Sequence, residues 1–342
     1  MKNRVNFLII STAFLFVLSC SDRSGKHYRI NEKYTEPGIE IKRLEKDLFE
    51  TDPARLTDLK DSLNTRYGNF LQLFAWVINA GDLGDSTSYE VIRDFVTDRV
   101  NYDVYQKVME KYPDLSAYEQ DMEKAWGRYS YHFPDSLIPG IYSFISGFNN
   151  SIIVGDSSLA FGLDRYLGSD SRYYRELGIY NYLTKKMVPG RIVPDAFYAW
   201  AKASWPRDKQ VINDNLLSNI IYEGKLYYFT KSMLYDMPDS LIFGYTAGQM
   251  EFCRNNEYRM WEYLIEHDML FSKDKMLIRK LTGEAPFTTY FTRESPGRAS
   301  LWLGFRIVES YMMRNRDVSL PGLMTDDNYK GFLEKARYNP EK

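Results

Sequence analysis

Charged residues interrupt the apolar faces of three helices that hydrophobic periodicity predicts. The helices over 214–231 and 246–267 each carry a glutamate in an apolar row, and the helix over 298–314 carries an arginine and a glutamate beside one. A buried carboxylate must be paired, must bind a metal or must take up a proton. We therefore predict a polar pocket between the three helices, a working or remnant active site in which arginines pair with carboxylates; a purely structural salt-bridge network is the alternative. Its residues, which include an arginine at the start of the third helix, are Glu223, Glu257, Arg298, Arg306 and Glu309.

The turn before the third helix offers a second kind of chemistry. The run Ser295-Pro296-Gly297-Arg298 places an arginine at a helix start. Backbone donors at such a start can bind an anion, and the alternative is an ordinary helix cap.

Several common catalytic motifs are missing from the chain. His27, His132 and His267 are the only imidazoles, so H-E-x-x-H cannot be written anywhere. Neither G-x-S-x-G nor a glycine-rich nucleotide motif occurs. A net charge of −2 gives no basic field for nucleic acid. We predict no catalytic residue, no metal, no cofactor and no nucleic-acid partner.

The first twenty residues predict export and lipid attachment. Two basic residues precede an apolar run over 7–18, which is too short to span a bilayer. The run ends in Val17-Leu18-Ser19-Cys20, which resembles a bacterial lipobox, so we predict a signal peptide over 1–19 and acyl chains, palmitate among them, on Cys20. Two acyl chains are enough for stable anchoring. The alternative is a simple signal peptide with an incidental cysteine.

The remaining chain is predicted to be a tether followed by one folded unit. Residues 20–38 are polar and unpatterned, which is typical of a flexible tether. No repeat or linker divides 39–342, so we predict a single domain there. With Cys20 acylated, Cys253 has no partner for a disulfide, and its helical context predicts a buried free thiol.

The elements that must position these residues follow the order helices, small sheet, helices, which predicts a predominantly helical α+β fold. Strands are predicted over 39–49, 141–147, 151–155 and 159–163. Helix starts are predicted at Asp52-Pro53, whose helix runs to Asn79, at capping boxes beginning at Thr87 and Ser116, at Pro194, at Thr246-x-x-Gln249 and at Ser295-Pro296.

Several longer motifs lie within 191–314. They are Val193-Pro194-Asp195, the run from Ile221 to Phe229, Gly244-Tyr245-Thr246 with Gln249, Asn256-Glu257 with Trp261, the run from Glu284 to Thr289, the run from Ser295 to Arg298, and the run from Trp302 to Tyr311. Together with the lipobox they resemble the gliding motility lipoprotein GldB family, and the resemblance covers the whole chain. It implies an envelope lipoprotein of Bacteroidota that is tied to gliding and to the associated secretion machinery.

A fainter likeness connects two of these helices with predicted zinc peptidases of the gluzincin type. In those proteins one helix carries H-E-x-x-H and a later helix supplies a glutamate as the third ligand. Glu223 matches that third-ligand position, and the helix from Pro194 to Ser204 is where H-E-x-x-H belongs, but it contains no histidine. The likeness implies a zincin-like scaffold that has lost its metal and keeps a cleft for binding.

Taken together, the sequence predicts a lipid-anchored protein of the cell envelope, at the outer membrane, that binds an envelope protein or peptide without catalysis. One alternative is a residual zincin-like hydrolase that uses Glu223 and Glu257. Another is a nutrient- or glycan-capture lipoprotein, because 28 Tyr, 20 Phe and 6 Trp offer rings for sugar stacking, although aromatics at helical spacing more often form core.

Overall fold

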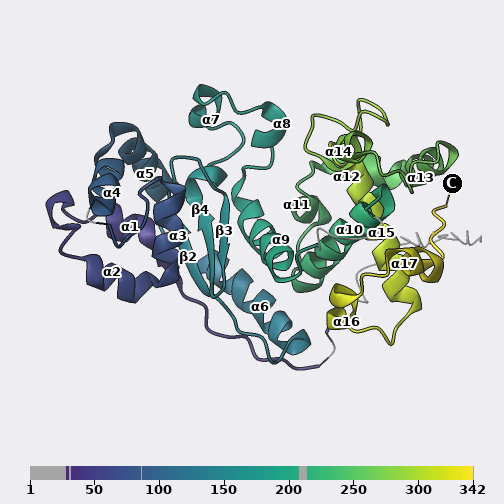
Figure 1. The fold of residues 1–342 in the computed structure, drawn as a ribbon, viewed down its shortest axis with the longest axis horizontal. Coiled ribbons are helices and arrows are strands. Elements are labelled where there is room, and N and C mark those ends of the chain that lie inside the picture. Colours follow the sequence, from purple (N-terminus) through teal and green to yellow (C-terminus); the bar gives the residue numbers. More distant parts are fainter. Residues whose placement is uncertain (1–27, 31, 86, 208–213, 342) are drawn as a thin grey trace, which may run out of the picture.

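The computed structural model describes residues 28–30, 32–85, 87–207 and 214–341. The predicted signal peptide and the predicted lipid-attachment residue, Cys20, lie outside these residues. The fold is predominantly helical with one small sheet, as the sequence predicts, and helices occupy both ends of its long axis (Figure 1). None of the described helices is both long and apolar enough to cross a bilayer.

The sheet contains the four predicted strands. Three are confirmed to within a few residues, and the one predicted over 39–49 is much shorter. Its order is β1-β2-β4-β3, with β1 and β4 parallel to β2 and with β3 antiparallel to β4. β3 is therefore an edge strand. The strands are β1 (Ile41–Arg43), β2 (Gly140–Phe144), β3 (Ile152–Gly155) and β4 (Ser158–Gly162).

Helices cover the sheet on two sides (Figure 1). α3 packs on β3 and β4 from the side of the amino-terminal helices, and α9 packs on the same strands from the other side, beside α6. The amino-terminal helices are α1 (Leu44–Phe49), α2 (Lys60–Tyr67), α3 (Asn69–Val77), α4 (Ser88–Thr97) and α5 (Arg99–Lys111). The helices on the other side are α6 (Ser116–His132) and α9 (Ile192–Ser204), and the shorter elements nearby are η2 (Pro53–Arg55), η3 (Leu163–Tyr166), α7 (Arg172–Glu176), α8 (Asn181–Thr184) and η4 (Pro189–Arg191).

The carboxy-terminal half is built around two long helices that touch backbone to backbone. A Cβ added at Gly304 would lie 1.8 Å from the carbonyl oxygen of Ile220, and one added at Gly224 would lie 2.4 Å from the carbonyl carbon of Gly304. Only glycine therefore fits at this crossing. The two helices are α10 (Leu216–Met233) and α15 (Ala299–Arg314); around them lie α11 (Asp239–Phe243), α12 (Ala247–Asn255), α13 (Glu257–Glu266), α14 (Lys275–Thr282), α16 (Leu320–Thr325) and α17 (Tyr329–Ala336).

An extended segment joins the two halves, and we call residues 28–30 and 32–40 the strap. At its start Tyr28 is only 4% exposed, donates a hydrogen bond to Glu309 Oε1 at 2.8 Å and packs against the ring of Tyr228. The strap then follows α6 toward β1 (Figure 1). The stretch predicted as a flexible tether, 20–38, thus contains one residue, Tyr28, that is packed into the fold.

Two α6 carboxylates hold the far end of the strap. Glu123 Oε1 accepts from the backbone N–H of Ile39 at 3.2 Å, and Glu119 Oε1 accepts from that of Ile41 at 2.9 Å. The predicted capping box that begins at Ser116 is therefore wrong. Its glutamate, Glu119, accepts a hydrogen bond from Ile41 instead of from the cap residue. Ser116 is the first helical residue rather than the cap.

The strand predicted over 39–49 is wrong beyond Arg43, because the chain turns directly into α1. Leu44 and Leu48, one helical turn apart, are both buried, so a helix serves burial here as well as a strand would. Glu45 is also buried; Arg43 pairs with it, and Ser143 Oγ donates to its Oε2 at 2.8 Å. Burial nevertheless raises the pKa of Glu45 above its ordinary value.

Helix boundaries differ from the predictions where glycine or a turn intervenes. The helix predicted from Asp52 to Asn79 is interrupted, because Gly68 has a φ of +52° between α2 and α3. The capping box at Thr87 is wrong as well, because that residue is itself in a helical conformation and makes no capping bond. The box formed by Thr246 and Gln249 is confirmed at the start of α12.

The helix predicted to start at Ser295 begins instead at Ala299. The intervening turn is tied to Thr288, whose hydroxyl donates to the Pro296 carbonyl at 2.7 Å and accepts from the Ala299 N–H at 2.9 Å. Arg298 has a φ of +61° at the end of that turn.

Candidate functional site

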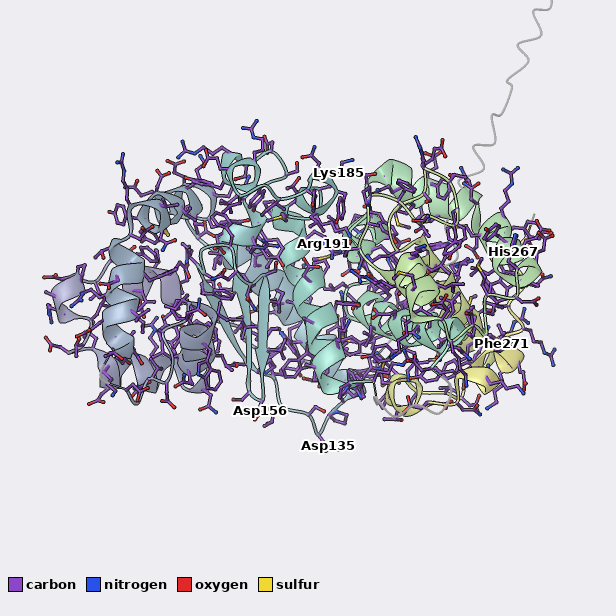
Figure 2. All side chains as sticks on the ribbon, turned by 45° about the horizontal axis from the view of Figure 1, so that its top comes forward. Asp135, Asp156, Lys185, Arg191, His267 and Phe271 are labelled. Carbon is purple, nitrogen blue, oxygen red and sulfur yellow. The ribbon has the colours of Figure 1, made fainter. Side chains whose placement is uncertain are left out.

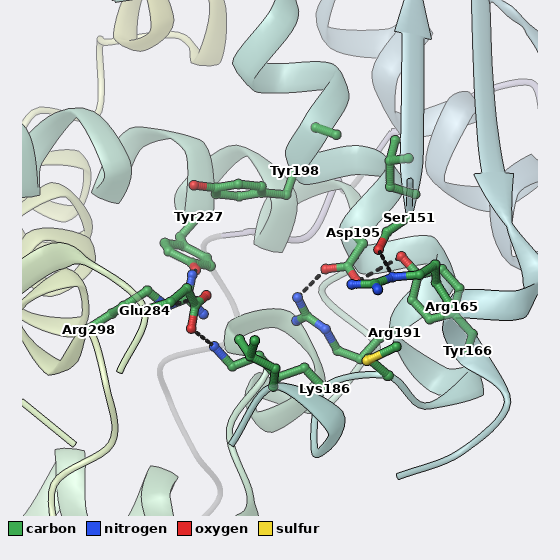
Figure 3. Close-up of a pocket in the computed structure, with 14 residues that line it drawn as sticks. Ser151, Arg165, Tyr166, Lys186, Arg191, Asp195, Tyr198, Tyr227, Glu284 and Arg298 are labelled. Carbon is green, nitrogen blue, oxygen red and sulfur yellow. Dashed lines mark hydrogen bonds and ion pairs between the residues drawn. The ribbon is translucent and has the colours of Figure 1, made fainter. Parts of the chain in front are cut away.

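A cavity of about 310 Å³ lies between the edge strand β3, the start of α9 and the turn before α15 (Figure 3). We call it the α9 pocket. Tyr166, Tyr198 and Tyr227 form part of its wall. The charged side chains that line it are Arg165, Lys186, Arg191, Asp195, Glu284 and Arg298.

The α9 pocket carries more positive than negative charge, with four cations against two carboxylates. Lys186 and Arg298 share one carboxylate, Glu284, and the Arg298 Nε to Glu284 Oε1 distance is 3.1 Å. Arg191 pairs with Asp195 one turn along. Arg165 makes no ion pair within the described residues and donates to the Ser151 hydroxyl and the Phe148 carbonyl, neutral oxygens of the loop that precedes β3. The pocket is therefore suited to an anionic ligand.

Arg191 is the most enclosed cation of the pocket. Only 8% of it is exposed, and its guanidinium donates to the carbonyls of Leu241 and Ile242, the latter at 2.8 Å. Gly244, with a φ of +67°, leaves space for the group, because a Cβ there would lie 3.0 Å from Arg191 Cζ. Among the described residues the buried Arg191 Nε has no hydrogen-bond partner. A buried donor without a partner is costly, so the enclosure of this guanidinium is not fully compensated by the protein.

The pKa values of the shared pair reflect the excess of cations. Burial and, to a smaller extent, the nearby Arg298 lower the pKa of Lys186 to about 8, although Glu284 opposes the shift. Burial alone would raise the pKa of Glu284, but Arg298 and Lys186 hold it below its ordinary value. One carboxylate therefore stabilises two cations, and a second anion would be favourable there.

Glu223 lies directly behind the pocket wall. Tyr198 donates its hydroxyl proton to Glu223 Oε2, and Lys202 Nζ lies 3.3 Å from Oε1. Tyr198 and Lys202 are four residues apart, so they occupy the spacing at which a zinc-binding helix presents its two histidines. In this chain a hydroxyl and an ammonium group contact the glutamate instead. No cluster of three or more His, Cys, Asp or Glu that could hold a metal is found within the described residues.

The other predicted carboxylates form a separate group at the middle of α15, which we call the α15 cluster. Arg306 Nε lies 3.1 Å from Glu257 Oε2, and its Nη1 pairs with Glu309. Trp302 Nε1 and the Tyr338 hydroxyl each donate to Glu257 at 2.9 Å. Burial raises the pKa of Glu309, which is 2% exposed, while Arg306 lowers it in part.

The structure thus divides the five predicted residues between two places. Arg298 lines the α9 pocket and Glu223 adjoins it through Tyr198, whereas the other three form the α15 cluster. The α9 pocket shares no lining residue with the cavity beside the cluster. The prediction of a buried free thiol at Cys253 is confirmed. This residue precedes Glu257 of the cluster by four positions.

Sequence reasoning missed most cations of the α9 pocket because they lie outside the three long helices. Lys186 and Arg191 come from the segment around α8 and η4, and Arg165 comes from η3. The one available signal was the spacing of Arg191 and Asp195, four residues apart, which favours an ion pair on a helix.

Comparisons with known proteins give one family. No curated protein and no solved structure matches the chain. The family model described as gliding motility protein GldB matches residues 26–340, and its label marks the members as lipoproteins. The match begins just before the strap and ends beyond α17, so it takes in both the α9 pocket and the α15 cluster. The chain therefore belongs to the GldB family of gliding motility proteins, lipoproteins of the cell envelope.

Proposed function

We propose that this chain is held at the outer membrane by acyl chains on Cys20 and that it binds an anionic segment of an envelope partner in the α9 pocket, without catalysis. The observation that carries the binding role is the charge of the pocket, in which Glu284 alone faces two cations and Arg165 has no carboxylate partner in the part of the chain that the structure describes. An acidic side chain or a terminal carboxylate of a partner supplies the missing charge.

Binding without catalysis is supported by the surroundings of Glu223. Each of its carboxylate oxygens already has a partner, Tyr198 on one side and Lys202 on the other. One lone pair on each oxygen is therefore engaged, and the ammonium group of Lys202 repels a metal ion at this carboxylate. This arrangement argues against the residual hydrolase.

The rings of the pocket argue against sugar capture. Tyr198 packs against Tyr227 with 5.1 Å between ring centroids, and Tyr227 packs against Phe243 at 4.4 Å. Their faces are therefore used within the protein, whereas a sugar needs an open ring face for stacking.

A photo-crosslinking residue in place of Leu183, a half-buried residue of the pocket wall, tests the proposal in the full chain expressed in its native cells. We expect a crosslink to one envelope protein. The double variant Arg165→Gln with Lys186→Gln should lose it, because two of the four pocket cations are removed.

The matched control is Arg175→Gln with Lys185→Gln. Both residues are exposed on the same segment and outside the pocket lining, and Figure 2 shows Lys185 at the surface above Arg191. This variant should keep the crosslink. A crosslink that survives loss of the pocket cations, or that the control also loses, contradicts the pocket as the binding site. The mass of the amino-terminal peptide tests acylation of Cys20 separately.

A further inference from the structure

Two adjoining cavities lie on the side of α15 that carries the start of the strap. Their volumes are about 500 and 460 Å³, and both are lined by Arg254, Glu257 and Arg306. The first extends to Tyr28 and Arg29 of the strap, and the second extends past Arg314 to Arg337 and the last described residues. Neither shares a lining residue with the α9 pocket.

Basic residues outnumber acidic ones around these cavities. Six cations stand against four carboxylates, and three of the carboxylates are engaged. Asp239 pairs with Lys231 at 2.8 Å and with Arg254 at 2.7 Å, and Glu257 and Glu309 belong to the α15 cluster. Three of the arginines are exposed and make no ion pair within the described residues. They are Arg29, Arg314 and Arg337, and we call them the basic face.

The place where the strap begins relates this face to the anchor. Tyr28 is buried against α10 and α15, so the chain is fixed there. Cys20 precedes Tyr28 by eight residues. Eight fully extended residues span at most about 28 Å. Acyl chains on Cys20 therefore keep this face close to the bilayer surface, within the length of a short peptide.

We propose that the basic face lies against the membrane and binds the phosphate groups of anionic lipid headgroups. The inference rests on the proposed acylation of Cys20, because the anchor sets which face approaches the bilayer. Charge complementarity supports it: each Lys or Arg near an anionic surface contributes about 1 kcal/mol, or about fivefold in occupancy. The helices α1–α5 lie at the opposite end of the long axis, so they project away from the membrane (Figure 1).

Hydrogen exchange on the acylated full chain tests this proposal. The protein is reconstituted into vesicles of phosphatidylcholine alone and into vesicles that also contain phosphatidylglycerol, so the anchor is the same and only the headgroup charge differs. We expect slower amide exchange over 310–316 and 335–341 in the anionic vesicles. The double variant Arg314→Gln with Arg337→Gln should lower the ratio of docked to undocked protein by about 30-fold and abolish this protection.

The matched control is Arg55→Gln with Arg99→Gln, which removes the same charge from exposed positions at the other end of the molecule. It should keep the protection. Equal exchange in the two kinds of vesicle, or equal loss in the control, overturns the proposal. So does equal protection by inorganic phosphate in neutral vesicles, which indicates a site for free phosphate. The amino-terminal peptide mass reports acylation, so failure of the anchor is distinguished from failure of the face.

Discussion

The α9 pocket and the α15 cluster are built from the same kinds of side chain in opposite proportions. In the cluster one cation, Arg306, lies between Glu257 and Glu309. In the pocket one carboxylate, Glu284, lies between Lys186 and Arg298. The carboxylates of the cluster also accept from neutral donors of the protein, so the cluster needs nothing from outside. An ion-pair network is therefore suited to binding a ligand only where the protein's own donors and acceptors leave part of its charge unsatisfied.

The largest effect is expected for Arg306→Met, which leaves Glu257 and Glu309 without their cation. Breaking a buried ion pair by removing one partner costs about 3–5 kcal/mol. The corresponding change in the pocket, Lys186→Met, leaves Glu284 paired with Arg298 and partly exposed, so it should cost about 1 kcal/mol or less. Urea unfolding of both variants measures the difference. Equal losses of unfolding free energy in the two variants would contradict the expected difference between the cluster and the pocket.

Gly304→Ala should affect both regions at once, because α10 supplies Tyr227 to the α9 pocket and α15 supplies Arg306 and Glu309 to the cluster. The added Cβ meets the Ile220 carbonyl, so the helices must separate, at a cost of about 3 kcal/mol. The control is Gly248→Ala in α12, where nothing lies within 4 Å. That change should stabilise the protein by about 0.5 kcal/mol through helix propensity. A Gly304→Ala protein with unchanged thermal unfolding shows that the helices do not meet this closely.

Binding of an anionic probe should depend on pH in the pocket and not in the cluster. Lys186 has a pKa of about 8, so it is charged at pH 7 and largely neutral at pH 9. Loss of one charge-assisted contact weakens binding about tenfold. We expect pentaglutamate to bind the full chain about tenfold more weakly at the higher pH. Calorimetry measures this, and Lys186→Gln should bind weakly at both pH values; a variant that keeps the pH dependence assigns it to another group.

A small effect is also expected for Glu223→Gln, which tests whether Glu223 belongs to a buried network. Its side chain is 18% exposed, and Lys202, its cationic partner, is 53% exposed. Tyr198 can still donate to the amide oxygen of glutamine. We expect a loss of about 1 kcal/mol, or a few degrees in melting temperature. A loss of stability as large as that of Arg306→Met would show that Glu223 belongs to a buried ion-pair network, as the carboxylates of the cluster do.

Periodicity predicted the parts of this fold whose burial repeats along one helix or strand. It gave α10, α15 and strands β2 to β4, and it identified Glu309 as a charge beside an apolar stripe that the structure buries. It failed where a glycine conformation decides, as at Gly68, and where a short segment such as α1 satisfies burial with either period.

The division of the site into two could not be predicted from the sequence, for a physical reason. A helical period shows which side of a helix is buried but not which other segment it meets. The ion pair of Lys186 and Glu284 joins two irregular segments that are 98 residues apart, and neither has a period. The sequence predicts that the buried carboxylates pair with arginines. Only the packing of the helices decides which arginine meets which glutamate.

The strap has a mechanical consequence. Its attachments are spaced along the chain, from the Tyr28 ring in the carboxy-terminal half through the two α6 carboxylates to the three register pairs of β1 with β2. A force applied at the amino terminus therefore meets these attachments in series, and each must yield before the next is loaded. The sheet that borders the α9 pocket is therefore loaded only after the contacts of Tyr28 and of the two α6 carboxylates have broken.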